Sequence, residues 1–254
     1  MARTSPLALL AATLALGACS SGPDTATVER QAGDDLFKKQ EFVQAAAAYQ
    51  RSLEANPKQE KVYERMAAAL MRAEKRDEAA QALVKTLEFK KDAAQKAEVY
   101  RNAAGVFLQS AERDKAKPYL QEALKLEPKD EASVSWLGEL AAFRGGARSN
   151  EMPAVAEDLD EALVWYGKLT ELKPESRPAW AHKRVVLVKY TNLMIERQKA
   201  ALESARQKRG ADREEARARA AGFGQRAEAM KKQVEEIDRK LAELKKAQQA
   251  AAAK

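Results

Sequence analysis

A helical hairpin recurs along this chain, and that repetition is the feature that most restricts what the chain can fold into. In residues 97–130, apolar side chains fall three or four residues apart in two stripes with a polar break between them, a spacing typical of two amphipathic helices. Pro128 ends the second helix, because its ring cannot continue the hydrogen-bond ladder. One hairpin cannot bury its apolar faces alone, so we expect the copies on either side to stack against it.

One copy matches a known repeat well. Residues 28–59 carry small, aromatic and leucine residues at a fixed spacing that ends in a proline: Gly33, Phe42, Ala45, Tyr49, Leu53 and Pro57. In this spacing the segment resembles the tetratricopeptide repeat (TPR), a unit of about 34 residues. Residues 60–93 and 97–130 follow in the same order. The resemblance implies an all-α fold, a TPR-type solenoid of helical hairpins.

A fourth unit begins at Asp130 and ends at Pro174, but an insertion separates its two halves. The inserted segment, residues 144–158, is rich in Gly, Ser, Asn and Pro, which predicts a loop that protrudes from the turn between the helices. The loop is either a passenger, because closure entropy grows slowly with length, or a contact for a partner.

The last part of the chain departs from the repeat. We expect a long helix from Arg177 to cover the end of the solenoid and then to leave it, which divides the chain into a solenoid at 28–195 and a basic helical, coiled-coil extension at 196–254. A second long helical stretch follows Gly210, with an expected interruption at 222–224. Beyond it, apolar residues have the heptad spacing of a coiled coil: Phe223, Ala227, Met230, Val234, Ile237, Leu241 and Leu244.

Three pairings of this heptad seam are open: with a second copy, with a partner, or back onto the helix before Gly210. Gly210 supplies a turn and the two arms are of similar length, so we favour the antiparallel fold-back.

The N-terminus has the layout of a secretory signal peptide over residues 1–18, with Arg3 before an apolar run at 7–16 that is too short to span a bilayer. The sequence LGAC that ends at Cys19 resembles the bacterial lipobox. That resemblance implies cleavage before Cys19, a thioether-linked diacylglycerol on its sulfur and, usually, a third acyl chain on its amine, with chains such as palmitate.

The residues that follow fit a lipid-anchored protein. Residues 19–27 are small and polar, as in a flexible tether. Ser20 directly after the cysteine favours, by the same resemblance, the outer membrane, with the protein facing the periplasm.

The formal charge is +7, of which Arg3 contributes one and the C-terminal extension six, because residues 196–254 hold 16 basic and 10 acidic side chains. This excess would attract an acidic protein, an anionic lipid or a cell-wall polymer. Because both signs are interspersed, a solvated surface of mixed charge is the favoured interpretation. No aromatic residues are interleaved for base stacking, and the chain is expected to be secreted, so nucleic acid is not expected as a partner.

No pattern typical of catalysis is present. The sequence has no glycine-rich phosphate loop, no GxSxG and no HExxH, and its one cysteine excludes an internal disulfide. His182 has no second histidine or cysteine with which to share a metal, so we expect a surface or packing role. We therefore predict a protein that is not an enzyme and has no cofactor or metal.

The TPR resemblance implies that peptides bind in a groove lined by the first helix of each repeat. The residues expected in this groove mix apolar and basic side chains, which suits an amphipathic segment: Arg30, Phe37, Lys38, Met71, Arg72, Arg101, Leu108 and Phe143.

Two functions are consistent with these features. The favoured one is an outer-membrane scaffold or assembly factor of a cell-envelope machine, which binds envelope proteins through the groove and the C-terminal helices. TPR lipoproteins of gliding-motility and type IV pilus complexes are examples. The alternative is a structural tether in which the basic helices or Lys254 contact peptidoglycan.

Overall fold

The computed structural model describes residues 24–149 and 151–252, and every regular element in these ranges is a helix. The expected signal peptide, Cys19 and Lys254 lie outside the described residues. Two short 3₁₀ helices, Thr86–Phe89 and Arg113–Lys115, lie between α-helices. The α-helices are α1 (Thr25–Lys38), α2 (Phe42–Ala55), α3 (Glu60–Arg72), α4 (Arg76–Lys85), α5 (Ala93–Leu108), α6 (Ala116–Leu126), α7 (Glu131–Arg144), α8 (Ala156–Leu172), α9 (Arg177–Gln207) and α10 (Gly210–Ala252).

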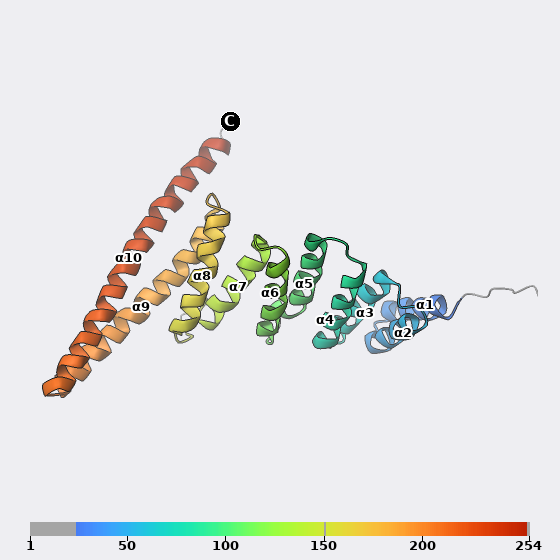
Figure 1. The fold of residues 1–254 in the computed structure, drawn as a ribbon, viewed down its shortest axis with the longest axis horizontal. Coiled ribbons are helices and arrows are strands. Elements are labelled where there is room, and N and C mark those ends of the chain that lie inside the picture. Colours follow the sequence, from blue (N-terminus) through green and yellow to red (C-terminus); the bar gives the residue numbers. More distant parts are fainter. Residues whose placement is uncertain (1–23, 150, 253–254) are drawn as a thin grey trace, which may run out of the picture.

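The first eight α-helices form four hairpins that stand side by side in an elongated row, and the long α9–α10 pair closes one end (Figure 1). Each helix packs on the helix before it and the helix after it. The prediction of an all-α TPR-type solenoid followed by long C-terminal helices is confirmed.

Side-chain caps begin α1, α5, α7 and α9, whereas α3 and the second helices of the hairpins have none. Asp24, Asp92, Asp130 and Ser176 accept hydrogen bonds from backbone N–H groups at the starts of α1, α5, α7 and α9. The helices α2, α4, α6 and α8 have no such cap. Asp92, Asp130 and Ser176 therefore stand at connections between one hairpin and the next, where they fix the start of the following helix.

Inside the hairpins, the residue on the first helix matches in size the residue that it faces on the second helix. A Cβ on Gly33 would lie 2.6 Å from the ring of Tyr49, and a Cβ on Gly138 would lie 2.8 Å from the ring of Tyr166. Both tyrosines are fully buried, so each needs a glycine opposite. In the other two repeats, alanine replaces the glycine of the first helix and leucine replaces the tyrosine of the second: Ala67 with Leu83, and Ala104 with Leu120.

The inserted segment is present as a loop between α7 and α8, but it is held against the solenoid rather than protruding freely. The backbone turns at Gly146, whose φ is +70°. The ammonium group of Lys189 on α9 donates to the carbonyl oxygens of Ser149 and Met152, at 3.1 and 3.0 Å. The sequence could not predict this because Lys189 lies far along the chain from the loop.

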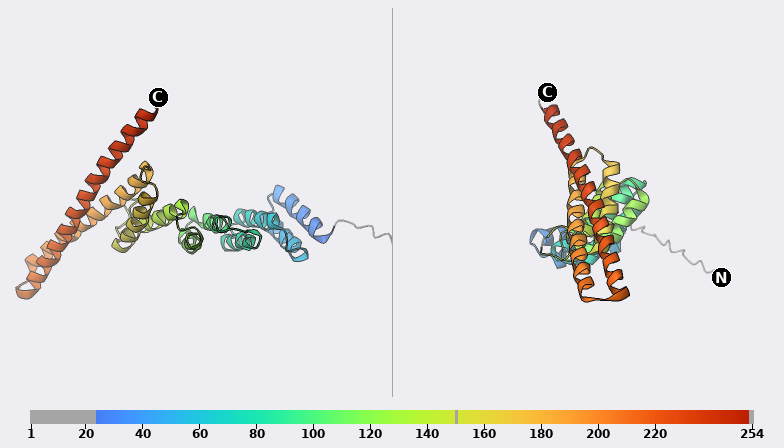
Figure 2. Two further views of the ribbon diagram at one scale, coloured as in Figure 1. Left: turned by 45° about the horizontal axis from the view of Figure 1, so that its top comes forward. Right: turned by 90° about the vertical axis from the view of Figure 1, so that its left-hand side faces the viewer.

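The fold-back of the C-terminal seam is confirmed. The helix α10 runs antiparallel along α9 and packs against it, and the right-hand view of Figure 2 shows the two helices beside each other. A tight turn at Gly210, with φ of +58°, reverses the chain. All seven predicted seam residues are buried or half-buried. The guanidinium of Arg184 on α9 also binds the carboxylate of Asp238 on α10.

The prediction of an interruption at residues 222–224 was wrong, because α10 continues through both glycines. Packing along α9 outweighs the low helix propensity of glycine. The second glycine also has a use, since a Cβ on Gly224 would lie 2.5 Å from the amide nitrogen of Gln198. Within the described residues, no helix combines the length and apolar character needed to cross a membrane.

Candidate protein-interaction surfaces

Two of the basic residues predicted for the first-helix groove, Arg30 and Arg101, form ion pairs within the chain. Arg101 on α5 lies 3.1 Å from the carboxylate of Asp130, the residue that also caps α7. Arg30 lies 3.5 Å from Asp34 on its own helix, and Arg65 on α3 donates to both oxygens of that same carboxylate. The pairs of Arg65 and Arg101 join neighbouring first helices, whereas the pair of Arg30 lies within α1. Arg30 and Arg101 therefore bind partners inside the solenoid.

The two aromatic residues predicted for the groove, Phe37 and Phe143, pack against other side chains of the chain. Phe37 packs edge-on against Phe42, with 5.3 Å between the ring centroids. The guanidinium of Arg113 lies over the ring of Phe143, with its central carbon 3.9 Å from the centroid.

The remaining predicted residues differ in how accessible they are. The Met71 side chain is 46% exposed. Arg72 and Lys38 are exposed, and Leu108 is half-buried. Met71 and Arg72 are adjacent at the end of α3, so they offer one apolar and one basic contact on the first-helix face.

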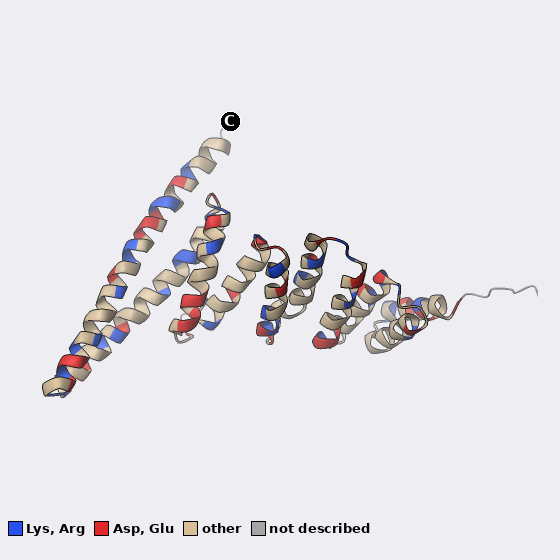
Figure 3. Ribbon diagram, viewed as in Figure 1, with Lys and Arg blue, Asp and Glu red and all other residues tan. Residues whose placement is uncertain are grey.

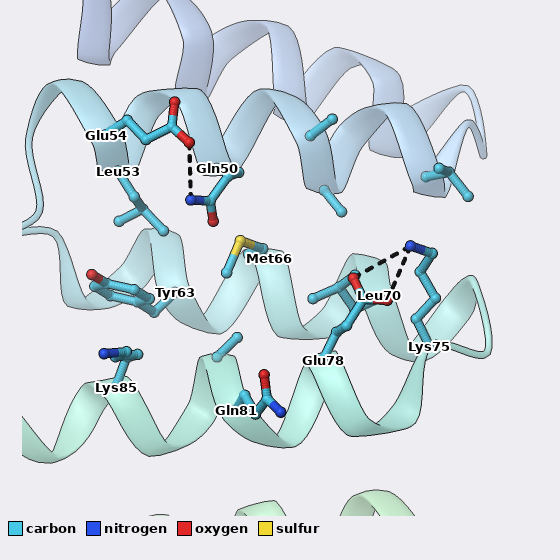
Figure 4. A pocket seen from close by; sticks show the side chains of 14 residues that line it. Gln50, Leu53, Glu54, Tyr63, Met66, Leu70, Lys75, Glu78, Gln81 and Lys85 are labelled. Carbon is cyan, nitrogen blue, oxygen red and sulfur yellow. Dashed lines mark hydrogen bonds and ion pairs between the residues drawn. The ribbon is translucent and has the colours of Figure 1, made fainter.

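A hollow in the solenoid lies on another face, between the second helices α2 and α4 with α3 as its floor (Figure 4). This trough has a volume of about 550 Å³. Leu53, Met66 and Leu70 are buried at its base, and the half-buried ring of Tyr63 borders one end. None of the eight predicted groove residues lines it.

Polar side chains border the trough. The amide of Gln50 on α2 donates to Glu54 at 3.1 Å, and the ammonium of Lys75 donates to Glu78 at 3.0 Å (Figure 4). Exposed apolar residues continue the rim on α2, where Val43 is 54% exposed. An apolar base between polar rims is the chemistry that accepts an amphipathic segment.

A second trough repeats this geometry one repeat further along, between α4 and α6 over α5, with a volume of about 420 Å³. The rings of Phe107 and Tyr119 stack there with centroids 6.0 Å apart. Lys115 reaches Asp77 across the trough at 2.7 Å. Sequence reasoning missed both troughs because the resemblance assigned binding to first helices. The outward apolar residues Val43 and Ala47, one turn apart on α2, were the available signal.

A polar cluster closes the first-helix face at the fourth repeat. The guanidinium of Arg148 donates to Glu139 at 2.9 Å, and the hydroxyl of Tyr166 donates to the same carboxylate at 3.0 Å. Burial alone would raise the pKa of Glu139, but these hydrogen bonds and the charge of Arg148 hold the pKa below its ordinary value.

His182 lies beside this cluster and packs edge-on against the ring of Tyr166, with 5.4 Å between centroids. Its Nδ1 is buried without a hydrogen-bond partner. Burial and then the cation of Arg148 lower the pKa of His182. Its neighbours fit the expected packing role. Across residues 24–149 and 151–252, no three His, Cys, Asp or Glu side chains gather in a group able to hold a metal ion.

Comparison with known proteins relates the chain to TPR proteins by structure alone. No family model and no curated protein matches the sequence. A TPR-repeats protein from Bacteroides fragilis has a TM-score of 0.51 and 15% identity, covering 87% of this chain and 98% of its own. At that identity the likeness shows a common fold.

Two further structures align with lower TM-scores. YrrB, described as a TPR protein with an unusual peptide-binding site, has a TM-score of 0.41 and 19% identity over 81% of this chain and 86% of its own. PilF from Pseudomonas aeruginosa has a TM-score of 0.39 and 18% identity over 86% and 97%.

Proposed function

We propose that this chain is a non-catalytic scaffold whose solenoid binds an amphipathic segment of another protein. The observation that carries the proposal is the open trough between α2 and α4, with its apolar base and polar rims. A solenoid offers such surfaces without any rearrangement, because each repeat contacts only its neighbours and leaves long faces open.

We further propose that the scaffold works at the outer membrane, on the periplasmic side, as part of an envelope machine of the gliding-motility or type IV pilus kind. The lipobox at Cys19 supports the anchor, and the TPR-type fold supports an assembly role. Two or three acyl chains hold a protein on a membrane far more firmly than one.

The binding surface is tested by site-specific photocrosslinking in cells of the source organism. A photoreactive residue replaces Ala47 on the trough rim in one full-length variant and Met71 on the first-helix face in another. We expect a specific envelope protein to crosslink at Ala47. Crosslinking at Met71 alone would place the ligand on the first-helix face, and no product at either site would contradict the scaffold.

A charge placed in the trough tests whether that contact matters. Ala47→Arg puts a cation on the apolar stretch of the α2 rim, beside Val43, and should abolish partner recovery in a pulldown. Gln44→Arg is the matched control, because Gln44 is exposed on the same helix but does not line the trough. Equal recovery with both variants would exclude the trough.

The anchor is tested separately. Cys19→Ser should remove acylation and release the protein from the outer-membrane fraction, or leave it uncleaved. Metabolic labelling with an alkyne fatty acid followed by fractionation measures both effects. Normal membrane retention of the variant would contradict the lipoprotein proposal.

A further inference from the structure

The tip of the α9–α10 hairpin stands away from the solenoid, at the opposite end of the molecule from α1 (Figures 1 and 2). Residues 203–219 form this tip, which comprises the end of α9, the turn at Gly210 and the start of α10. All of these residues are exposed except three: Ser204, Ala205 and Ala216. The tip can therefore touch a separate surface without interference from the repeats.

Pairing within each helix cancels most of the negative charge of the tip. Its sequence mixes six basic and four acidic residues. Three of the four acidic residues bind an arginine three or four residues further along the same helix: Glu203 with Arg206, Glu214 with Arg217, and Glu215 with Arg219. The interspersed acidic side chains that favoured a neutral, solvated surface are thus largely engaged inside the hairpin.

The charge that remains is mainly positive. Lys208, Arg209, Arg213 and Asp212 form no ion pair with any residue that the structure describes, so three cations stand against one carboxylate. Lys208 and Arg209 connect the two helices, and Arg213 lies in the first turn of α10. The three exposed cations therefore surround Gly210 at the very end of the hairpin. Cations gathered in this way repel one another, and a surface of fixed negative charge removes that cost.

We infer that the tip binds the phosphate groups of anionic phospholipids, which makes the hairpin a second membrane contact of this chain. Guanidinium groups donate paired hydrogen bonds to phosphate oxygens, and an ammonium group binds phosphate as a point charge. Basic side chains are attracted to an anionic membrane within about a Debye length, roughly 8 Å at physiological salt.

The choice of a membrane as partner rests on the proposed lipid anchor at Cys19. A few cations alone hold a protein weakly on a membrane, but an anchored chain meets the same headgroups at an effective concentration of about millimolar. The anchor precedes α1 and the tip lies at the other end of the molecule (Figure 1). Two contacts so placed lay the solenoid along the membrane instead of letting it project.

Energy transfer between the tip and the membrane tests the inference in the full-length, lipidated protein. Gln207→Cys at the tip carries a donor dye, and a headgroup-labelled lipid is the acceptor. The acylated sulfur of Cys19 does not react with the dye, and the chain has no other cysteine. The protein is reconstituted in vesicles of phosphatidylcholine alone or with added phosphatidylglycerol. We expect strong transfer in the anionic vesicles and a loss of transfer in the neutral ones or at raised salt.

Charge reversal locates the contact. Arg209→Glu combined with Arg213→Glu should lower the transfer in anionic vesicles to the level of neutral vesicles. Lys245→Glu combined with Lys246→Glu is the matched control, because it changes the net charge equally at the far end of α10, where both lysines are exposed. Equal transfer in both kinds of vesicle, transfer that survives reversal at the tip, or an equal loss in the control would each overturn the inference.

Two further measurements separate this result from the proposed function. Ala47→Arg should leave the transfer unchanged, so a failure of the binding trough does not affect it. If Cys19 proves not to be acylated, sedimentation of the chain with anionic but not neutral vesicles, lost on reversal at the tip, would still support the contact. The absence of such sedimentation, or binding to isolated cell-wall sacculi in place of anionic vesicles, would overturn it.

Discussion

The solenoid and the outer arm of the α9–α10 hairpin, residues 196–207 and 210–227, are both made of antiparallel helices. Different contacts hold the two regions together. In the solenoid, ion pairs connect separate elements, such as Arg65 with Asp34 and Lys117 with Glu161. In the outer arm, the pairs lie within one helix: Arg206 with Glu203, Arg217 with Glu214, and Arg219 with Glu215. Basic and acidic residues are interspersed along both helices of the hairpin (Figure 3).

The apolar contacts differ in the same way. Tyr49 and Tyr166 fit against glycines in the solenoid, whereas alanines form the seam of the arm. The solenoid therefore has one specific packing arrangement, while the arm has a generic one.

The largest expected effect tests the specific packing of the solenoid. Gly33→Ala places a methyl group against the ring of Tyr49 and should lower the free energy of unfolding by about 2 to 3 kcal/mol. Chemical denaturation followed by circular dichroism measures the change. Adding Tyr49→Leu should recover part of the loss, because it recreates the alanine and leucine pair of the second and third repeats. A double variant no better than Gly33→Ala would contradict the size matching.

A smaller effect compares ion pairs in the two regions. Asp130→Ala removes the cap of α7 and leaves Arg101 without its partner, so it should cost about 2 kcal/mol. Glu203→Ala removes a pair within one exposed helix and should change stability by less than about 0.5 kcal/mol. Equal losses in thermal or denaturant unfolding would remove the distinction between the regions.

Acid should weaken the fourth repeat and not the arm. The folded state lowers the pKa of His182 below its ordinary value of 6.5. As the pH falls below 6.5, the unfolded chain therefore binds more protons than the folded one, and stability decreases. The lowered pKa of Glu139 stabilises the fold above its ordinary value of 4.5, and that contribution is lost as pH falls through the folded value. His182→Phe keeps a ring against Tyr166 and should flatten the dependence between neutral pH and about pH 5. Hydrogen exchange should locate the residual change at α7 to α9, and a change in the outer arm would contradict this.

The smallest effect is a gain in the hairpin. Gly222 is exposed in α10 with open space around it, so Gly222→Ala should raise stability by about 0.5 to 1 kcal/mol. Gly224→Ala is its control two residues away, where the new methyl group displaces the side chain of Gln198 and should reduce or cancel the gain. The midpoint of thermal unfolding reports both.

Local patterns predicted the parts of the fold that depend on contacts close in sequence. The spacing from Gly33 to Pro57 and the seam from Phe223 to Leu244 both repeat at helical periods, and the helices formed accordingly. Helix propensity misled at residues 222–224, because packing against α9 outweighs the cost of two glycines.

The candidate surfaces were harder to predict. The pairing of Arg101 with Asp130, and that of Lys189 with the inserted loop, depend on how one repeat is set against the next. The trough over Met66 depends on the separation of α2 and α4, and in the sequence only the outward apolar residues Val43 and Ala47 indicated it.

The continuity of α9 gives the molecule a lever. Its base is packed on α8, and its far end forms the outer arm, with no break in the helix between them. A helix of 31 residues is about 46 Å long, so a tilt of roughly 10° at the base moves the tip by about 8 Å. Small adjustments where the fourth repeat meets α9 are thereby magnified into displacements at the opposite end of the protein from α1 (Figure 1).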